Sequence, residues 1–292
     1  MKRFSQWLAT AAVTAGLLGA AFIGPAQAAA PKAAPATRRG GETPVVIFIK
    51  RNMPRLPGID APQAQPQRAP SGGDPTPAPQ AQGKTIYLDP GHGSSDVGAV
   101  HKDANGNVDL MERDANLAIA LKLADMLRQK GHNVVLTRTD SQAPAMERGT
   151  PADLQARADK ANRAGADIFV SIHNNGSANT ALKGTETFYC ADRANSADSQ
   201  RLAKLVQNGF IANLAKAGYE TVDRGAKDDS YIGHYAVLGE DNLARPTQMP
   251  AIIGESLFVS NEQDAAQLKR PEIQTAIAKG YFDGIMAYFN NA

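Results

Sequence analysis

The stretch IYLDPGHGSSDVGA, residues 86–99, begins as a short apolar run and then breaks into a glycine-rich turn. Such a run is typical of a buried strand, and Pro90, Gly91 and Gly93 end it. Glycine allows the backbone to turn sharply, so the turn can bring the His92 imidazole inward. The pattern predicts a buried strand followed by a functional loop.

The same alternation continues to the C-terminus. Strand-like runs are TIYLD (85–89), NVVLT (133–137), DIFVSI (167–172), TETFYC (185–190) and AIIGE (251–255). Helical patterns lie between or after them, at 114–130, 154–163, 196–217 and 271–289. Strands that alternate with crossover helices predict one α/β domain over residues 84–292, with a mostly parallel twisted sheet covered by helices on both faces.

The first 28 residues have the pattern of a secretory signal peptide. Lys2 and Arg3 precede an apolar run over residues 7–23, and Ala26-Gln27-Ala28 fits a cleavage site. A transmembrane anchor is the alternative, but the apolar run is short for a membrane span and ends at a Gly-Pro pair. We expect an exported protein of the periplasm or extracellular cell envelope, with no stable membrane anchor after cleavage.

Residues 29–83 form a basic arm rich in Pro, Ala and Gln, which we expect to be a disordered spacer. One apolar segment interrupts it, TPVVIFIK at 43–50. This segment is either an apolar patch of the arm without a specific partner, or a strand that adds to a sheet edge or to a partner protein. The mature chain is close to neutral because cleavage removes Lys2 and Arg3 and no acid, which argues against nucleic acid as a partner.

Ionisable side chains occur where three of the predicted strands end. His92 follows the first strand, His173 follows DIFVSI, and Glu255 closes AIIGE. In parallel sheets such ends meet at one edge, where functional groups gather. Two imidazoles and a carboxylate are a common ligand set of catalytic zinc, and Glu112, at the start of the first long helix, is the best third ligand. That leaves Glu255 as a general base.

Each of these residues also has an ordinary explanation. A histidine in a glycine turn is often only a loop residue. A glutamate at a helix N-terminus is favoured by the helix dipole, and a glutamate at a strand end often forms a salt bridge. Spacing alone gives no compact signature for a metal site.

Five segments in fixed order resemble the zinc-dependent N-acetylmuramoyl-L-alanine amidases of the amidase 3 family. They are IYLDPGHGSSDVGA, MERDANLAIALKLADMLRQKGHNVVLTRTD, ARADKANRAGADIFVSIHNNGS, KGTETFY and MPAIIGESLFVSN. The resemblance implies that His92, Glu112 and His173 bind Zn²⁺ and that Glu255 is the catalytic carboxylate. It also implies hydrolysis of the amide between the lactyl group of N-acetylmuramic acid and L-alanine in peptidoglycan, a step of cell-wall remodelling.

Four further residues are candidate substrate contacts. Arg224 and Lys227 could bind a stem-peptide carboxylate, although solvated surface charge is the alternative. Asn175 stands where this chain departs from the family pattern, in a position that shapes the pocket. His234 lies in the segment 228–248, which could form a lid or a subsite wall. Cys190, the only cysteine, is expected to be an unreactive thiol that is buried or partly buried.

Two other functions remain open from the sequence. One is a peptidoglycan-binding or activating module without turnover, and the other is a zinc peptidase that cuts within the stem peptide. The presence of all four site residues favours the amidase. A protein activator is compatible with the sequence but has no motif of its own.

Overall fold

The computed structural model describes residues 83–143, 151–239 and 243–290. The predicted signal peptide, almost all of the basic arm and its apolar segment at 43–50 lie outside these residues. In the part of the chain that is described, no helix combines the length and apolar character needed to cross a membrane.

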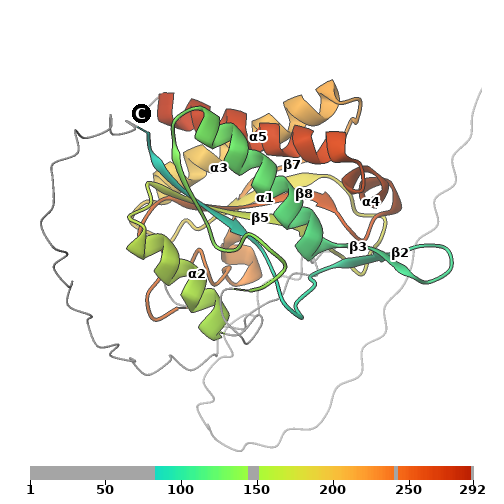
Figure 1. The fold of residues 1–292 in the computed structure, drawn as a ribbon, viewed down its shortest axis with the longest axis horizontal. Coiled ribbons are helices and arrows are strands. Elements are labelled where there is room, and N and C mark those ends of the chain that lie inside the picture. The colour runs from blue at the N-terminus through green and yellow to red at the C-terminus, as the bar shows by residue number, and fades with distance from the viewer. Residues whose placement is uncertain (1–82, 144–150, 240–242, 291–292) are drawn as a thin grey trace, which may run out of the picture. The chain divides into compact units, whose positions relative to one another are not determined.

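A mostly parallel sheet forms the centre of the domain (Figure 1). Its strand order is β4-β1-β5-β8-β6-β7. The strands are β1 (Thr85–Pro90), β4 (Asn133–Leu136), β5 (Ile168–Asn175), β6 (Thr185–Tyr189), β7 (Asp223–Asp228) and β8 (Ala251–Phe258). Neighbours are parallel except at the β6/β8 pair, so β6 and β7 run opposite to the other four strands.

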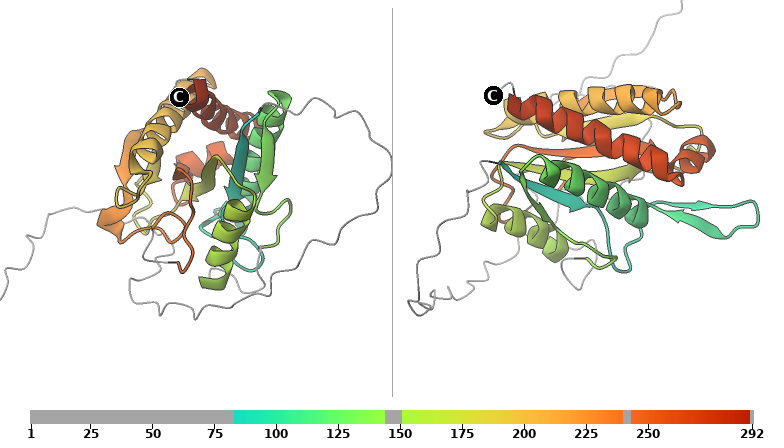
Figure 2. Two further views of the ribbon diagram at one scale, coloured as in Figure 1. Left: turned by 90° about the vertical axis from the view of Figure 1, so that its left-hand side faces the viewer. Right: turned by 45° about the horizontal axis from the view of Figure 1, so that its top comes forward.

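Helices cover both faces of this sheet, as Figure 2 shows. On one face lie α1 (Glu112–Gln129), α3 (Ser196–Lys216) and α5 (Pro271–Asn290), and on the other lies α2 (Pro151–Arg163). Alternation along β1 explains the two layers, because Ile86 and Leu88 join one apolar core while Tyr87 joins the other. The predicted fold class is confirmed.

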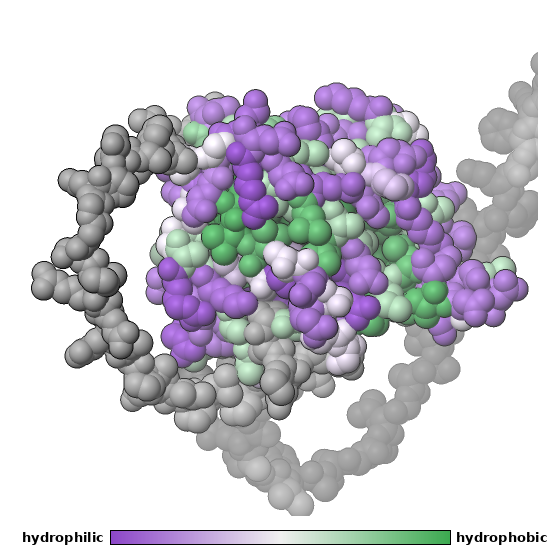
Figure 3. Space-filling view, in the orientation of Figure 1, coloured by the Kyte–Doolittle hydropathy of each residue, from purple (hydrophilic) through white to green (hydrophobic). Residues whose placement is uncertain are grey.

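Several short elements have no counterpart among the predicted ones. They are the hairpin of β2 (Val100–Lys102) and β3 (Val108–Met111), the 3₁₀-helix η1 (Asp229–Ile232), the helix α4 (Glu262–Leu268) and strand β7. The hairpin projects from the domain (Figure 1), and its Val100 and Val108 are exposed. On the face seen in Figure 3, apolar side chains gather near the centre and hydrophilic side chains surround them.

Two strands extend past the residues that were expected to follow or close them. His173 lies inside β5 and Glu255 inside β8, and these two residues are register partners. The pairing continues to Asn175 and Phe258, since both strands are buried between neighbours and their ladder has partners to continue with. The site residues are therefore held by sheet hydrogen bonds rather than by free loops.

A buried ion pair ties α2 to the sheet. Arg157 Nη1 lies 2.8 Å from Asp89 Oδ1, and its Nη2 lies 3.1 Å from Asp153 Oδ2, with all three side chains buried. Burial alone would raise the pKa of Asp89, but the Arg157 charge and hydrogen bonds outweigh it and lower that pKa. Because the charges are out of water, each depends on its partner.

Replacing Arg157 by methionine should lower the free energy of unfolding by about 3–5 kcal/mol, because two buried carboxylates lose their cation. The matched control is Arg245→Met, which removes an arginine whose side chain is 52% exposed and which pairs with Asp159 of the same helix. That change should cost at most about 1 kcal/mol. Urea unfolding of both variants measures the difference, and equal losses would contradict the stabilising role of the buried pair.

Candidate active site

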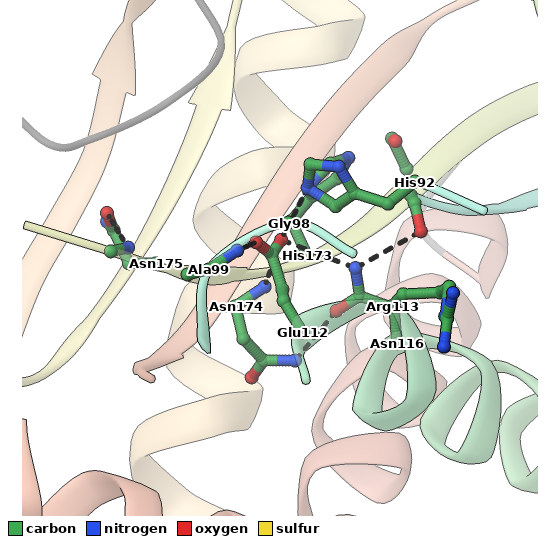
Figure 4. A network of polar contacts seen from close by, with 12 residues as sticks. His92, Gly98, Ala99, Glu112, Arg113, Asn116, His173, Asn174 and Asn175 are labelled. Carbon is green, nitrogen blue, oxygen red and sulfur yellow. Dashed lines mark hydrogen bonds and ion pairs between the residues drawn. The ribbon is translucent and has the colours of Figure 1, made fainter. Parts of the chain in front are cut away.

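Two imidazoles, of His92 and His173, meet around the carboxylate of Glu112, and the three residues come from distant parts of the chain (Figure 4). Glu112 Oε1 lies 3.0 Å from His92 Nε2 and 2.9 Å from His173 Nδ1. The two imidazole rings lie edge to face, with centroids 4.9 Å apart. One ligand atom of each residue lies within 4.8 Å of the other two, which is close enough for a single metal ion.

Each member of this cluster is positioned by the end of a regular element. His173 lies near the end of β5, His92 lies in the turn after β1, and Glu112 is the first residue of α1. The His92 backbone has φ 63°, an uncommon value for a residue other than glycine. Such a conformation requires support from its surroundings, and the turn receives it.

Two buried arginines hold the turn that carries His92. Arg138 Nε donates to the carbonyls of Pro90 and His92, and its Nη2 donates to the carbonyl of Gly91. Arg157 Nη2 donates to the His92 carbonyl as well, at 2.8 Å. The imidazole is further held by a contact of 2.9 Å between its Nδ1 and Asp96 Oδ2.

Glycines leave room for the cluster. A Cβ atom on Gly91 would lie 2.1 Å from His173 Nε2, and one on Gly98 would lie 2.4 Å from Glu112 Oε2 and 2.7 Å from the His92 ring. These distances are too short for any side chain. Gly98 has φ +67° as well, so both its conformation and its position require glycine.

The electrostatics of the cluster suit a cation. Burial alone would lower the pKa of His92, but the Glu112 charge and hydrogen bonds to Asp96 and Glu112 outweigh it and raise that pKa to about 10. Burial would likewise raise the pKa of Glu112, yet the two imidazoles hold it well below its usual range. The two imidazoles thus stabilise the ionised form of a buried carboxylate.

A row of acidic and imidazole side chains crosses the sheet beside the cluster. Glu255 on β8 is the register partner of His173 on β5 and of Glu186 on β6. Paired residues point to the same face, so the three side chains lie side by side. Burial raises the pKa of Glu255 well above its usual value, and the charges of Glu112 and Glu186 add to this effect.

Three of the four predicted substrate contacts converge on Glu186. Asn175 Nδ2 and Lys227 Nζ each lie 2.5 Å from a Glu186 carboxylate oxygen, and Arg224 Nε lies 3.1 Å from one. The Arg224 guanidinium also lies over the Phe258 ring. Sequence reasoning missed Glu186 because TETFYC looks like an ordinary strand, and only the β6/β8 pairing brings it to the site.

Two further histidines lie in polar clusters of their own, and the position of His234 differs from the sequence-based expectation. His234 lies beside Cys190, Asp192 and Asp229, away from the His92 cluster. His101, which was not among the candidate site residues, is buried and contacts Asp109 and Glu262. No signal near His101 could reveal this, since Glu262 comes from α4, far along the chain.

A cleft is lined by residues of β2, of the loops that follow β5 and β8, and of the start of α4, and it includes none of the four site residues. Its lining residues are Val100, His101, Lys102, Ser177, Ala178, Thr180, Ser260, Asn261 and Glu262. Ala99, which precedes the lining residues of β2, donates its backbone N–H to Glu112 Oε2 at 2.9 Å. The residues of β2 that line the cleft therefore follow directly after a residue that contacts Glu112.

The fold and site define an α/β protein with a His-Glu-His cluster able to bind a metal ion where its parallel strands end. A family model for N-acetylmuramoyl-L-alanine amidases, amidase 3, matches residues 86–287. The chain therefore belongs to the amidase 3 family, and it is an N-acetylmuramoyl-L-alanine amidase.

Relatives and solved structures agree with this assignment. The germination-specific N-acetylmuramoyl-L-alanine amidase of Bacillus subtilis is 32% identical over 213 residues, which are 71% of this chain and 80% of that protein. The N-acetylmuramoyl-L-alanine amidase LytC of Bacillus subtilis is 34% identical, over 71% of this chain but only 36% of LytC. The CwlD amidase of Clostridioides difficile, solved with the GerS lipoprotein, is 31% identical with a TM-score of 0.58, covering 72% of this chain and 100% of that one.

Replacing Gly98 by alanine should lower amidase activity by about 10- to 100-fold, because the new methyl group must displace Glu112 or His92. The matched control is Gly106→Ala in the β2/β3 hairpin, where φ is +84° but nothing lies within 4 Å of the added Cβ. Both variants carry a similar backbone penalty, so any additional loss of thermal stability in Gly98→Ala comes from the crowding of Glu112 and His92. Dye release from labelled peptidoglycan measures activity, and equal activities would contradict the crowding argument.

Proposed function

We propose that this chain hydrolyses the amide between the lactyl group of N-acetylmuramic acid and L-alanine with the help of zinc. The observation that carries the proposal is the convergence of His92, Glu112 and His173 within 4.8 Å, with Glu255 in register beside His173. The family supplies the reaction, and this geometry supports the assignment of roles to individual residues.

The donor set fits zinc. Two imidazole nitrogens and one carboxylate oxygen are a usual set for a catalytic zinc site with an open position. Asp96 on the second nitrogen of His92 is the kind of outer partner that fixes a ligand imidazole. When bound there, zinc would act as a Lewis acid on the scissile carbonyl and would lower the pKa of a water molecule.

Glu255 is suited to move the proton. Its carboxylate is buried, and among the described residues its Oε2 has no hydrogen-bond partner. A raised pKa makes it a better base for the attacking water and a competent acid for the leaving amine of L-alanine. We assign Glu255 this shuttle, which begins as a base and ends as an acid.

The group around Glu186 is suited to the stem peptide. Arg224 and Lys227 share one carboxylate, so the group keeps a net positive charge beside Glu255. Stem peptides carry carboxylates, which this charge would attract. We assign Arg224 and Lys227 to substrate binding, and Asn175 to holding Glu186 in place.

The site of action follows from the substrate. We propose that residues 1–28 direct export and are removed, that residues 29–83 are a spacer, and that the domain acts on peptidoglycan in the periplasm or extracellular envelope during cell-wall remodelling. The CwlD amidase was solved in complex with the GerS lipoprotein, and by this similarity we extend the proposal to a protein partner for this chain.

Chelation should abolish turnover and zinc should restore it. Purified sacculi incubated with the full chain should release stem peptides that begin at L-alanine, detected by mass spectrometry, and treatment with a chelator should stop the release. Peptides cut internally with the lactyl amide intact would identify a peptidase instead. Binding without soluble product would identify a module without turnover.

The variant Glu255→Gln should lose about 10²–10⁴-fold in kcat while keeping its zinc, because glutamine cannot accept the proton. Glu220→Gln, at an exposed position, is the control and should be fully active. Metal analysis and product assays on both variants check this. Near-normal turnover in Glu255→Gln would show that another group is the base.

A further inference from the structure

A second cluster of metal-binding side chains lies where β6 and β7 end. Cys190 follows β6, while Asp229 and His234 follow β7. His234 Nδ1 lies 2.8 Å from Asp229 Oδ1 and 3.6 Å from Cys190 Sγ. One ligand atom from each residue lies within 4.8 Å of the others, and Cys190 and Asp229 are buried.

We propose that Cys190, Asp229 and His234 form a second site for a divalent metal ion, with zinc as its preferred occupant. Thiolate, imidazole and carboxylate are all regular zinc ligands, and sulfur disfavours magnesium and calcium. Nothing in the amidase reaction requires these three side chains. The cluster therefore has a structural task rather than a catalytic one.

The other polar atoms of the ligands are already held by the chain. His234 Nε2 lies 3.3 Å from Asp192 Oδ2, which leaves Nδ1 directed at the cluster. Asp229 Oδ2 accepts the backbone N–H of Tyr235 at 2.9 Å, which leaves Oδ1 directed there too. A carboxylate on the far nitrogen of a ligand histidine is a recurrent outer contact of zinc sites.

The backbone also favours this arrangement. His234 has φ 67°, a conformation that side-chain-bearing residues adopt rarely. The strain persists because it aims the imidazole at Cys190 and Asp229. Metal binding compensates such strain, with one proton leaving the Cys190 thiol and the Nδ1 proton of His234 moving to Nε2 beside Asp192.

The second site is separate from the first. Glu186 pairs with Glu255, and Cys190 lies four residues further along the chain, directly after the end of β6. At the usual strand rise this is about 13 Å, towards the opposite edge of the sheet. A metal there would fasten the end of β6 to residues 229–234, and so hold Tyr235 against Phe188, whose ring centroid lies 5.2 Å away.

Cobalt distinguishes the two sites, because only the second contains sulfur. Metal-stripped full chain titrated with Co²⁺ should develop a thiolate-to-cobalt charge-transfer band in the near ultraviolet. The band should persist in His173→Ala, which damages the first site. It should be absent in Cys190→Ser and in His234→Gln, and the control His132→Gln should keep it.

Zinc content and stability give an independent reading. The full chain should bind about two zinc ions, and Cys190→Ser and His173→Ala about one each. In the His173→Ala background, excess zinc should raise the melting temperature by about 5–10 °C, and adding Cys190→Ser should remove that rise. Matching circular dichroism spectra of the variants without metal verify that each is folded.

The opposite results overturn the proposal. A chain that shows no charge-transfer band with cobalt, or that binds equal zinc with and without Cys190, has no second site. Loss of activity in His173→Ala with the band retained tests the first site alone. The two proposals therefore succeed or fail separately.

Discussion

A carboxylate buried between two imidazoles is the constraint on which the rest of this domain depends. Glu112 is almost fully buried, and its contacts with His92 and His173 lower its pKa despite that burial. The surrounding structure maintains that condition. Glycines at 91 and 98 let the rings and the carboxylate approach, and Arg138 fixes the carbonyls of the turn that carries His92. The proposed metal binding would therefore be coupled to folding through the same few contacts.

The order of strands in the sheet places three ionisable side chains side by side next to this carboxylate. Because β5, β8 and β6 are adjacent, His173, Glu255 and Glu186 form neighbouring pairs on one face. The negative charge of Glu112 and Glu186 then adds to burial in raising the pKa of Glu255. Register thus determines both where Glu255, the proposed proton shuttle, lies and how strongly it holds its proton.

Sequence reasoning found the residues whose position follows from parallel strands, and it missed those that depend on a reversed strand. His92, Glu112, His173 and Glu255 were expected together and the fold class was confirmed, because apolar runs and helical periodicity determine which ends share an edge. The direction of β6 has no local signature. Glu186 therefore escaped notice, and His234 was expected near substrate although its partners come from β6 and the segment after β7.

The reversed direction of β6 and β7 also explains why clusters of metal-binding side chains lie at both ends of the strands. In a fully parallel sheet every strand ends at the same edge, and functional side chains gather there. Reversal of two strands sends their following loops to the opposite edge, where Cys190 and Asp229 meet. Strand β6 therefore places Glu186 beside Glu255 and leads directly into Cys190 of the second cluster. Fixing the far end of β6 would in turn fix the position of Glu186 beside Glu255.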